Sequence, residues 1–178
     1  ELSTYISGRY AELKVLPLSF FEFLELHPGD RETRFRQYLR TGSLPIVDPD
    51  GDEQFEQDLL MGVFNTVLMK DVLGHDGSTN ASVLGDVSRF LYSNVGNITS
   101  CNSIAEAIGT DNRQVRRYLD GLRNAFLIYK AERYDICGKK LLDTLEKYYV
   151  SDTGMRNAVL GISSGEDISR LVENVVYL

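Results

Sequence analysis

The stretch TSCNSIAEAIGTDNRQVRRYLDGLRNAF, residues 99–126, decides the fold of this chain. Its first part predicts a short helix over residues 103–108. The capping box Ser103-x-x-Glu106 opens that helix, and Gly109 stands where many helices end in a left-handed residue. A short helix that stops so abruptly is typical of the first half of a helix-turn-helix.

The second part of the stretch predicts a longer helix over residues 111–126, capped by Thr110. One apolar stripe runs along it at steps of four, three and four residues: Val115, Leu119, Leu122 and Phe126. The opposite face is rich in arginine. This division into an apolar and a basic face favours the recognition helix of a helix-turn-helix.

A β-hairpin is expected directly after that helix. Residues 127–134 and 147–150 are rich in β-branched and aromatic residues and predict two strands, with a turn at Gly138-Lys139-Lys140. The helix-turn-helix and the hairpin together predict a winged helix-turn-helix.

The residues before the winged helix predict a helical pair and a strand-helix corner. Apolar residues recur at helical spacing over 55–72, and a second helix runs from the Asn80 cap to Gly96. Residues 10–16 alternate as a strand, and the capping box that starts at Ser19 opens a short aromatic helix. We therefore expect a mainly α fold of the α+β type, with a short N-terminal strand-helix segment, a helical bundle and a winged helix-turn-helix.

Composition and charge limit the class of protein. The chain has 178 residues, of which 43% are hydrophobic, and no apolar stretch approaches the roughly 20 residues that cross a bilayer. The short apolar stretches predict no membrane partner. Two cysteines are too few for a disulfide framework, which favours a reducing, cytoplasmic compartment. The net charge is −7, yet residues 113–140 hold 8 Lys/Arg against 3 Asp/Glu. This basic segment on an acidic protein is a candidate surface for an anionic partner.

The basic segment supplies the candidate nucleic-acid-binding residues, with double-stranded DNA as the partner. If the helix over 111–126 enters a major groove, residues near its N-terminal end reach base edges and later ones reach phosphates. The candidates are Arg113 and Gln114 for bases, Arg116, Arg117 and Arg123 for phosphates, and Lys139 and Lys140 at the wing tip for the adjacent backbone. Asp120 lies on the same face and weakens the case, because it repels phosphates or pairs with a neighbouring arginine.

Several motifs together resemble a prokaryotic group of AAA-type ATPases, members of the AAA+ superfamily, in which a conserved domain of unknown function follows the ATPase core. The motifs are Leu2-Ser-Thr-Tyr-Ile-Ser-Gly-Arg9-Tyr10, Phe64-Asn-Thr-Val-Leu-Met-Lys-Asp71, Ala125-Phe-Leu-Ile-Tyr129, Lys147-Tyr-Tyr-Val-Ser-Asp152-Thr-Gly-Met-Arg-Asn157 and Leu171-Val-Glu-Asn-Val-Val-Tyr177. The resemblance covers nearly the whole chain. It implies that the chain is the C-terminal part that follows the ATPase core.

The resemblance also implies a division into domains. Residues 1–47 would end the ATPase core and form linker or lid helices, and residues 48–97 would form a helical subdomain. Residues 98–155 would be the winged helix-turn-helix, and residues 156–178 would begin a truncated nuclease-like domain. Arg9 would then be a nucleotide sensor in the parent protein.

No catalytic residues or metal ligands are expected within the chain. It lacks the G-x-x-x-x-G-K-[ST] loop that cradles phosphates, so no cofactor is expected here, and ATP and magnesium belong to the parent protein. His27 and His75 have no histidine or cysteine at metal-ligand spacing. Asp152 is expected to cap a helix.

Two functions remain open at this point. The first is a winged-helix DNA-binding or regulatory module, coupled to ATP hydrolysis elsewhere in the parent protein. The second is a packing module that links the ATPase core to a C-terminal effector domain, which makes both domains of the parent chain its partners. A salt series separates the two, because DNA affinity falls steeply with salt whereas apolar packing does not.

Overall fold

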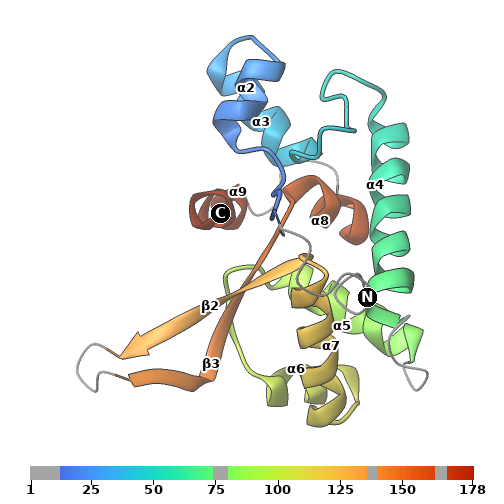
Figure 1. Ribbon diagram of the computed structural model, residues 1–178, viewed down its shortest axis with the longest axis vertical. Coiled ribbons are helices and arrows are strands. Elements are labelled where there is room, and N and C mark those ends of the chain that lie inside the picture. The colour runs from blue at the N-terminus through green and yellow to red at the C-terminus, as the bar shows by residue number, and fades with distance from the viewer. Residues whose placement is uncertain (1–12, 74–79, 136–139, 163–167) are drawn as a thin grey trace.

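A computed structural model describes residues 13–73, 80–135, 140–162 and 168–178 of the chain, and Figure 1 shows their arrangement. The described residues are mainly helical and include a small antiparallel sheet, which confirms the expected fold class. The predicted helix-turn-helix and its hairpin are both present.

Most of the elements are helices, and a β-hairpin comes late in the chain. The helices are α2 (Phe20–Leu26), α3 (Arg31–Thr41), α4 (Glu53–Val67) with its π-helical continuation η1 (Leu68–Leu73), α5 (Ala81–Ser93), α6 (Cys101–Ile108), α7 (Asn112–Asn124), α8 (Thr153–Leu160) and α9 (Ile168–Tyr177). The strands are β1 (Ile98–Thr99), β2 (Ile128–Asp135) and β3 (Lys140–Val150). Their order in the sheet is β1-β3-β2, and all pairings are antiparallel.

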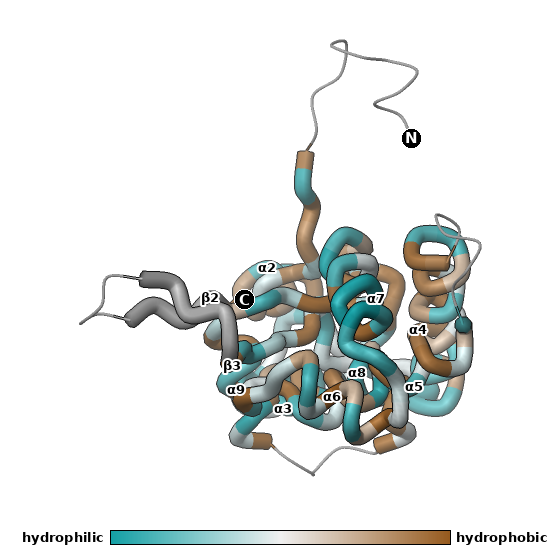
Figure 2. The backbone as a smooth tube through the Cα atoms, turned by 90° about the horizontal axis from the view of Figure 1, so that it is seen from below, coloured by the Kyte–Doolittle hydropathy of each residue, from teal (hydrophilic) through white to brown (hydrophobic). Residues whose placement is uncertain are grey.

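The N-terminal region differs from its prediction in one respect. The capping box at Ser19 is confirmed, since the Ser19 N–H donates to the Glu22 carboxylate at 2.8 Å. The strand expected over 10–16 was wrong for residues 13–16, which belong to no strand, and its remaining residues lie outside the described part of the chain. Residues 13–16 lead away from the body of the molecule (Figure 2). An alternating pattern forms a strand only where it pairs with a sheet edge, and residues 13–16 pair with none of the three strands.

The helix-turn-helix and the helices before it share one hydrophobic core. Leu84 and Val87 of α5 pack there with Ile104 of α6 and with Val115 and Leu122 of α7, and all five side chains have no exposed surface. Each such side chain stabilises the fold by roughly 1.5–3 kcal/mol relative to an exposed position. The expected helical pair and winged helix therefore pack as one body.

Helix α8 ties this body to α3. Asp152 caps α8 as expected, because its carboxylate accepts from the Met155 N–H at 2.7 Å, and it also accepts from the Ser43 N–H at 2.6 Å. The Asn157 amide donates to the carbonyls of Leu39 and Arg40 at 3.1 and 2.9 Å. These bonds satisfy the last carbonyls of α3, which have no partner within their own helix.

The close crossing of α3 and α8 requires a glycine at position 154. A Cβ atom at Gly154 would stand 2.0 Å from the Thr41 carbonyl oxygen, far inside van der Waals contact. Backbone therefore approaches backbone at this point, and only glycine permits the approach.

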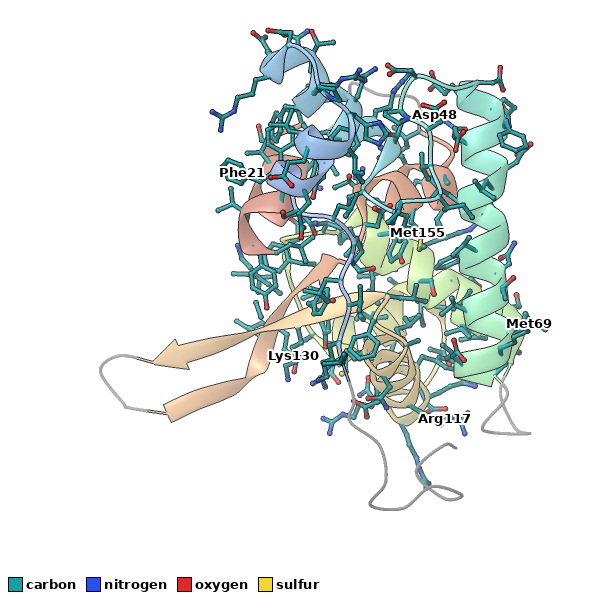
Figure 3. All side chains as sticks on the ribbon, turned by 45° about the horizontal axis from the view of Figure 1, so that its top comes forward. Phe21, Asp48, Met69, Arg117, Lys130 and Met155 are labelled. Atoms are coloured by element: carbon teal, nitrogen blue, oxygen red, sulfur yellow. The ribbon has the colours of Figure 1, made fainter. Side chains whose placement is uncertain are left out.

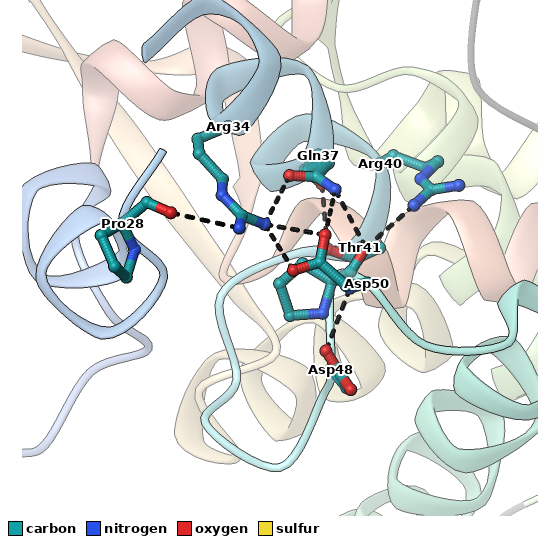
Figure 4. A network of polar contacts seen from close by, with 8 residues as sticks. Pro28, Arg34, Gln37, Arg40, Thr41, Asp48 and Asp50 are labelled. Carbon is teal, nitrogen blue, oxygen red and sulfur yellow. Dashed lines mark hydrogen bonds and ion pairs between the residues drawn. The ribbon is translucent and has the colours of Figure 1, made fainter. Parts of the chain in front are cut away.

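The acidic turn before α4 is held on α3 (Figure 4). Arg34 contacts both carboxylate oxygens of Asp50 at 2.8 Å, and the Gln37 amide donates to Asp50 at 2.8 Å. The Asp50 side chain is 56% exposed, so this pair contributes at most about 1 kcal/mol. Its role is to fix the path of the turn, which the Arg40 bond to the Pro49 carbonyl also supports.

Helix α9 packs on the outer face of the hairpin. The Glu173 carboxylate accepts from Lys147 at 2.9 Å and from the Tyr149 hydroxyl at 2.7 Å, and Tyr177 stacks on Tyr149 with ring centres 4.0 Å apart. We call Lys147, Tyr149 and Glu173 the clamp trio. Asn174 is fully buried and bonds both backbone groups of Val150, at 2.8 and 3.0 Å.

Candidate functional site

The caps of the helix-turn-helix lie one or more residues from their expected positions. Helix α6 is capped by Ser100, which exchanges hydrogen bonds with Ser103, so the prediction that Ser103 opens the helix was wrong. Asp111 and not Thr110 caps α7, through the Gln114 N–H at 2.8 Å. Gly109 does adopt the expected left-handed conformation, with φ 76°. The turn thus brings the N-terminus of α6 beside α7.

The apolar stripe of α7 also differs at its end. Helix α7 stops at Asn124, and Phe126 has φ 56° and an exposed ring, so its place in the stripe was wrong. Tyr118 is buried instead, and its hydroxyl accepts from the Asn80 N–H at 3.0 Å. A tyrosine can sit in a core when its hydroxyl finds such a partner.

The basic face of α7 divides into residues that point to solvent and residues that line a pocket. Arg113 is exposed in the first turn. The Gln114 amide donates to the Tyr118 hydroxyl at 3.1 Å and its oxygen accepts from Thr110, so this side chain is engaged within the protein. The Arg117 guanidinium lies 5.7 Å from the centre of the Tyr118 ring, and Figure 3 shows its side chain directed away from the body.

The side chains of three other expected site residues lie outside the part of the chain that the structure describes. Arg9 and Lys139 fall outside the described residues. Lys140 is the first residue of β3, and its side chain is also outside the description.

Arg116 and Arg123 line a pocket of about 550 Å³ between α6, α7 and the hairpin. Its other walls come from the first turn of α6 and from the strands. The lining residues are Ser100, Cys101, Asn102, Arg116, Leu119, Asp120, Arg123, Lys130, Glu146 and Tyr148. Three cations and two carboxylates therefore face one space, and the volume is that of a small-molecule site.

The hairpin wall of the pocket is a connected group of charges. Lys130 on β2 contacts Glu146 on β3 at 2.5 Å, and the Tyr148 hydroxyl donates to the same carboxylate. We call Lys130, Glu146 and Tyr148 the pocket trio. Lys130 lies at the base of the hairpin beside α7 (Figure 3).

The pocket trio is held in one charge state. Burial alone would raise the pKa of the Glu146 carboxyl, but the hydrogen bonds from Lys130 and Tyr148 outweigh it and lower the pKa. Burial and the neighbouring carboxylate raise the pKa of the Tyr148 phenol. Glu146 thus stays ionised near neutral pH, and its charge balances that of Lys130.

The α7 wall is less balanced. Arg123 reaches Asp120 at 3.4 Å, a long and exposed pair that contributes little. Arg116 lines the pocket beside Cys101, and in the described part of the chain no carboxylate pairs with it. Burial, followed by the Glu146 charge, raises the pKa of that thiol, so Cys101 adds no negative charge. Arg116 therefore presents an unbalanced cation to the pocket.

Sequence reasoning missed the hairpin residues of this site. Lys130 and Tyr148 are direct partners in the ladder between β2 and β3, which places them on one face, with Glu146 two residues further along. The alternating pattern of residues along β2 and β3 could have indicated which of them share this face. The register that pairs the two strands, however, depends on the length of the turn between them. Ser100 and Asn102 enter the site only because the cap of α6 lies at Ser100.

The described residues hold neither a metal-binding cluster nor a membrane-spanning helix. No group of three or more His, Cys, Asp or Glu in them is arranged to hold a metal ion. No helix among them has the length and apolar character needed to span a bilayer.

Comparison with known proteins places the chain in a family. Residues 32–166 match the family described as a domain of unknown function, DUF8612. The chain belongs to this family. No solved structure matches it.

Two relatives of this DUF8612 chain come from distant organisms. An uncharacterized protein of Haemophilus influenzae is 36% identical over all of this chain and 46% of its own length. The uncharacterized protein MJ1544 of Methanocaldococcus jannaschii is 24% identical over all of this chain and 43% of its own length. The chain thus spans a little less than half the length of these relatives.

The assignment to the AAA-type ATPases was wrong, because the chain belongs to DUF8612 and neither relative is described as an ATPase. The segments that suggested it have structural roles here. Leu127, Ile128 and Tyr148 are core residues, and Asp152 and Asn157 tie α8 to α3. Such segments report how a chain packs, and packing does not identify an activity.

The two functions inferred from that resemblance were therefore wrong as well. They are the DNA-binding or regulatory module coupled to ATP hydrolysis, and the packing module between an ATPase core and an effector domain. The partners of the same parent chain fall too, and double-stranded DNA gains no support from the DUF8612 family or the two relatives.

Some expectations are tested by neither the fold nor the family. The individual assignments of the α7 and wing residues to nucleic acid and of Arg9 to a nucleotide stay predictions. So do the boundaries after residues 47, 97 and 155 and the absence of a cofactor.

Proposed function

We propose that this DUF8612 chain is a binding module for a small anionic ligand, which it holds in the pocket between α6, α7 and the hairpin. The ligand's anionic group is of the phosphate or carboxylate type. The observation that supports this function is the convergence of Arg116, Arg123 and Lys130 on one pocket, in a protein whose net charge is −7.

Arg116 is the residue on which binding depends most. Lys130 is balanced by Glu146, and Arg123 is partly balanced by Asp120, whereas no carboxylate of the described chain pairs with Arg116. A guanidinium presents several N–H donors in one plane, which fits two oxygens of a phosphate or carboxylate. An anion at this place gains a charge-assisted contact without breaking an existing pair.

The first turn of α6 supports the same position. Ser100, Cys101 and Asn102 line the pocket, and the Ser100 side chain accepts from the Ser103 N–H. The N–H groups at the start of a helix have no partner within the helix and carry partial positive charge. Together with Arg116 they form a mixed backbone and side-chain cradle of the kind that anions favour.

Calorimetric titration with inorganic phosphate and with acetate tests this function. We expect saturable binding of at least one of the two anions by the natural chain. Arg116→Ala should weaken that binding by tenfold or more, because a charged hydrogen bond is worth roughly 1.5–3 kcal/mol. The matched control is Arg113→Ala, which removes an arginine of the same helix that does not line the pocket.

A second readout places the anion in the pocket. In a Cys137→Ser background Cys101 is the remaining cysteine, and its reaction with a disulfide reagent should slow when the anion binds. Equal loss of binding in Arg113→Ala and Arg116→Ala would refute the pocket. So would duplex DNA that binds more tightly than phosphate and depends equally on Arg113, Arg116 and Arg117.

A further inference from the structure

We infer that the pocket selects a ligand with a single phosphate-type group and rejects one in which a second phosphate follows the first, with Asp120 and Glu146 as the residues that determine this specificity. The inference rests on the proposed function, since it concerns the same pocket. It assigns a chemical class to the ligand, namely a monophosphate and not a di- or triphosphate.

The cations available to a ligand are concentrated at one place. Arg116 lines the pocket together with Ser100, Cys101 and Asn102 at the start of α6. One anionic group at this place compensates the unbalanced charge of Arg116. A second phosphate joined to the first would have to lie among the remaining lining residues of the same pocket.

Two of those lining residues are carboxylates, one on each wall of the pocket. On α7, Asp120 follows Arg116 by four residues, which is slightly more than one turn or about 6 Å along the helix. On the hairpin, Glu146 lines the same pocket and is pinned there by Lys130 and Tyr148. Since Glu146 is tied to two partners, it cannot turn away without breaking both bonds.

The two carboxylates also occupy the other cations. Lys130 is held by Glu146, and Arg123 has Asp120 beside it, so a second phosphate would meet a carboxylate at each of these two cations. The carboxylates would repel this second phosphate before it could contact Arg123 or Lys130. A hydroxyl or amino group of the ligand meets no such obstacle, because each carboxylate can accept a hydrogen bond from it.

Competition between inorganic phosphate and inorganic pyrophosphate measures this selectivity. Calorimetry at constant ionic strength should give the natural chain an affinity for pyrophosphate no more than about threefold above that for phosphate. Asp120→Asn should raise the ratio of the two affinities about fivefold, since one carboxylate near a phosphate at the protein surface costs on the order of 1 kcal/mol. Glu146→Gln should raise it similarly.

The matched control is Glu106→Gln, which removes one negative charge from an exposed position of α6 outside the pocket. It should leave the ratio unchanged. Retained phosphate binding by Asp120→Asn shows that this variant is folded, so the inference does not depend on the more buried Glu146.

The outcomes separate the two proposals. Failure of the natural chain to bind either anion, with acetate also inactive, refutes the proposed function, and the selectivity falls with it. Phosphate binding that depends on Arg116, combined with a pyrophosphate affinity more than threefold higher in the natural chain, overturns the selectivity alone. A ratio that is the same in Asp120→Asn as in Glu106→Gln overturns it as well.

Discussion

On each face of the hairpin a lysine, a tyrosine and a glutamate come together, and the two groups have different uses. The pocket trio of Lys130, Glu146 and Tyr148 lies on the face toward α7. On the other face, Lys147 and Tyr149 of the clamp trio contact Glu173 of α9. In the pocket trio both charged groups belong to the hairpin. In the clamp trio the carboxylate comes from a helix, so its bonds hold that helix on the sheet.

Burial separates the two trios further. The Lys130 and Glu146 side chains are 21% and 12% exposed, whereas Lys147 and Glu173 are 39% and 45% exposed. Charges that are largely shielded from water interact more strongly, and they also cost more when one partner is lost. A lysine–glutamate pair thus forms a rigid wall of the pocket on one face of the hairpin, whereas a second such pair is a weak, exposed contact on the other face.

The largest loss of stability is expected from removal of Asn174, an uncharged residue that holds α9 on β3. Asn174→Ala removes both bonds to the Val150 backbone and strands a buried N–H and a buried carbonyl. We expect the free energy of unfolding to fall by about 2–4 kcal/mol, since each stranded group costs roughly 1–3 kcal/mol. Urea denaturation measures this loss, with the exposed Asn124→Ala as control. Equal losses in both variants would contradict the role of Asn174.

The difference in burial predicts unequal effects for the two lysines. Lys130→Met leaves the shielded Glu146 without its cation and should lower the free energy of unfolding by about 1–3 kcal/mol. Lys147→Met breaks the more exposed pair and should cost less than about 1 kcal/mol. Urea denaturation of both variants at low and high salt compares them. Losses of the same size in both variants would contradict the distinction between the shielded pair of the pocket trio and the exposed pair of the clamp trio.

The aromatic stack should contribute a smaller share to the clamp side. Tyr177→Ala removes the ring that stacks on Tyr149, and stacked pairs are worth about 0.5–1.5 kcal/mol beyond their burial. Tyr177→Phe keeps the ring and loses only the hydroxyl bond to the Lys130 carbonyl. Thermal denaturation should therefore rank the natural chain first, Phe second and Ala last. Equal melting temperatures for Tyr177→Phe and Tyr177→Ala would show that the stacked ring does not stabilise the fold.

The smallest expected effect is a difference in acid sensitivity. The pKa of Glu146 is lowered from its ordinary 4.5, so its ionised form stabilises the folded state above about pH 4.5. That contribution is lost as the pH falls through the lowered pKa. Glu146→Gln should therefore lose stability less steeply than the natural chain between about pH 5 and pH 3. Parallel curves in urea denaturation at each pH would contradict this assignment.

The sequence predicted the helix-turn-helix well because local signals determine it. Gly109 ends α6 in the expected conformation, and Val115 and Leu122 are buried as their spacing indicates. The errors lie at the ends of elements. Several serine, threonine and aspartate residues precede each helix, and only the packed structure decides which of them becomes the cap.

The site could be predicted only in part. The arginines of α7 were visible as a basic face, but their division between solvent and pocket depends on what packs beside each one. Lys130 and Glu146 are 16 positions apart in the sequence, and only the hairpin register brings them together. The tie between Asp152 and Ser43 spans 109 positions and leaves no local pattern.

The tie between α8 and α3 has a consequence for how the protein is made. The bonds that satisfy the end of α3 come from Asp152, Thr153 and Asn157, which are 109 to 118 positions later in the chain. A ribosome therefore releases α2 and α3 long before their anchor emerges. The first helices must wait unanchored while the winged helix, built from nearer neighbours, assembles. Docking of α2 and α3 is thus expected to be a late event during synthesis, controlled by residues more than 100 positions further along the chain.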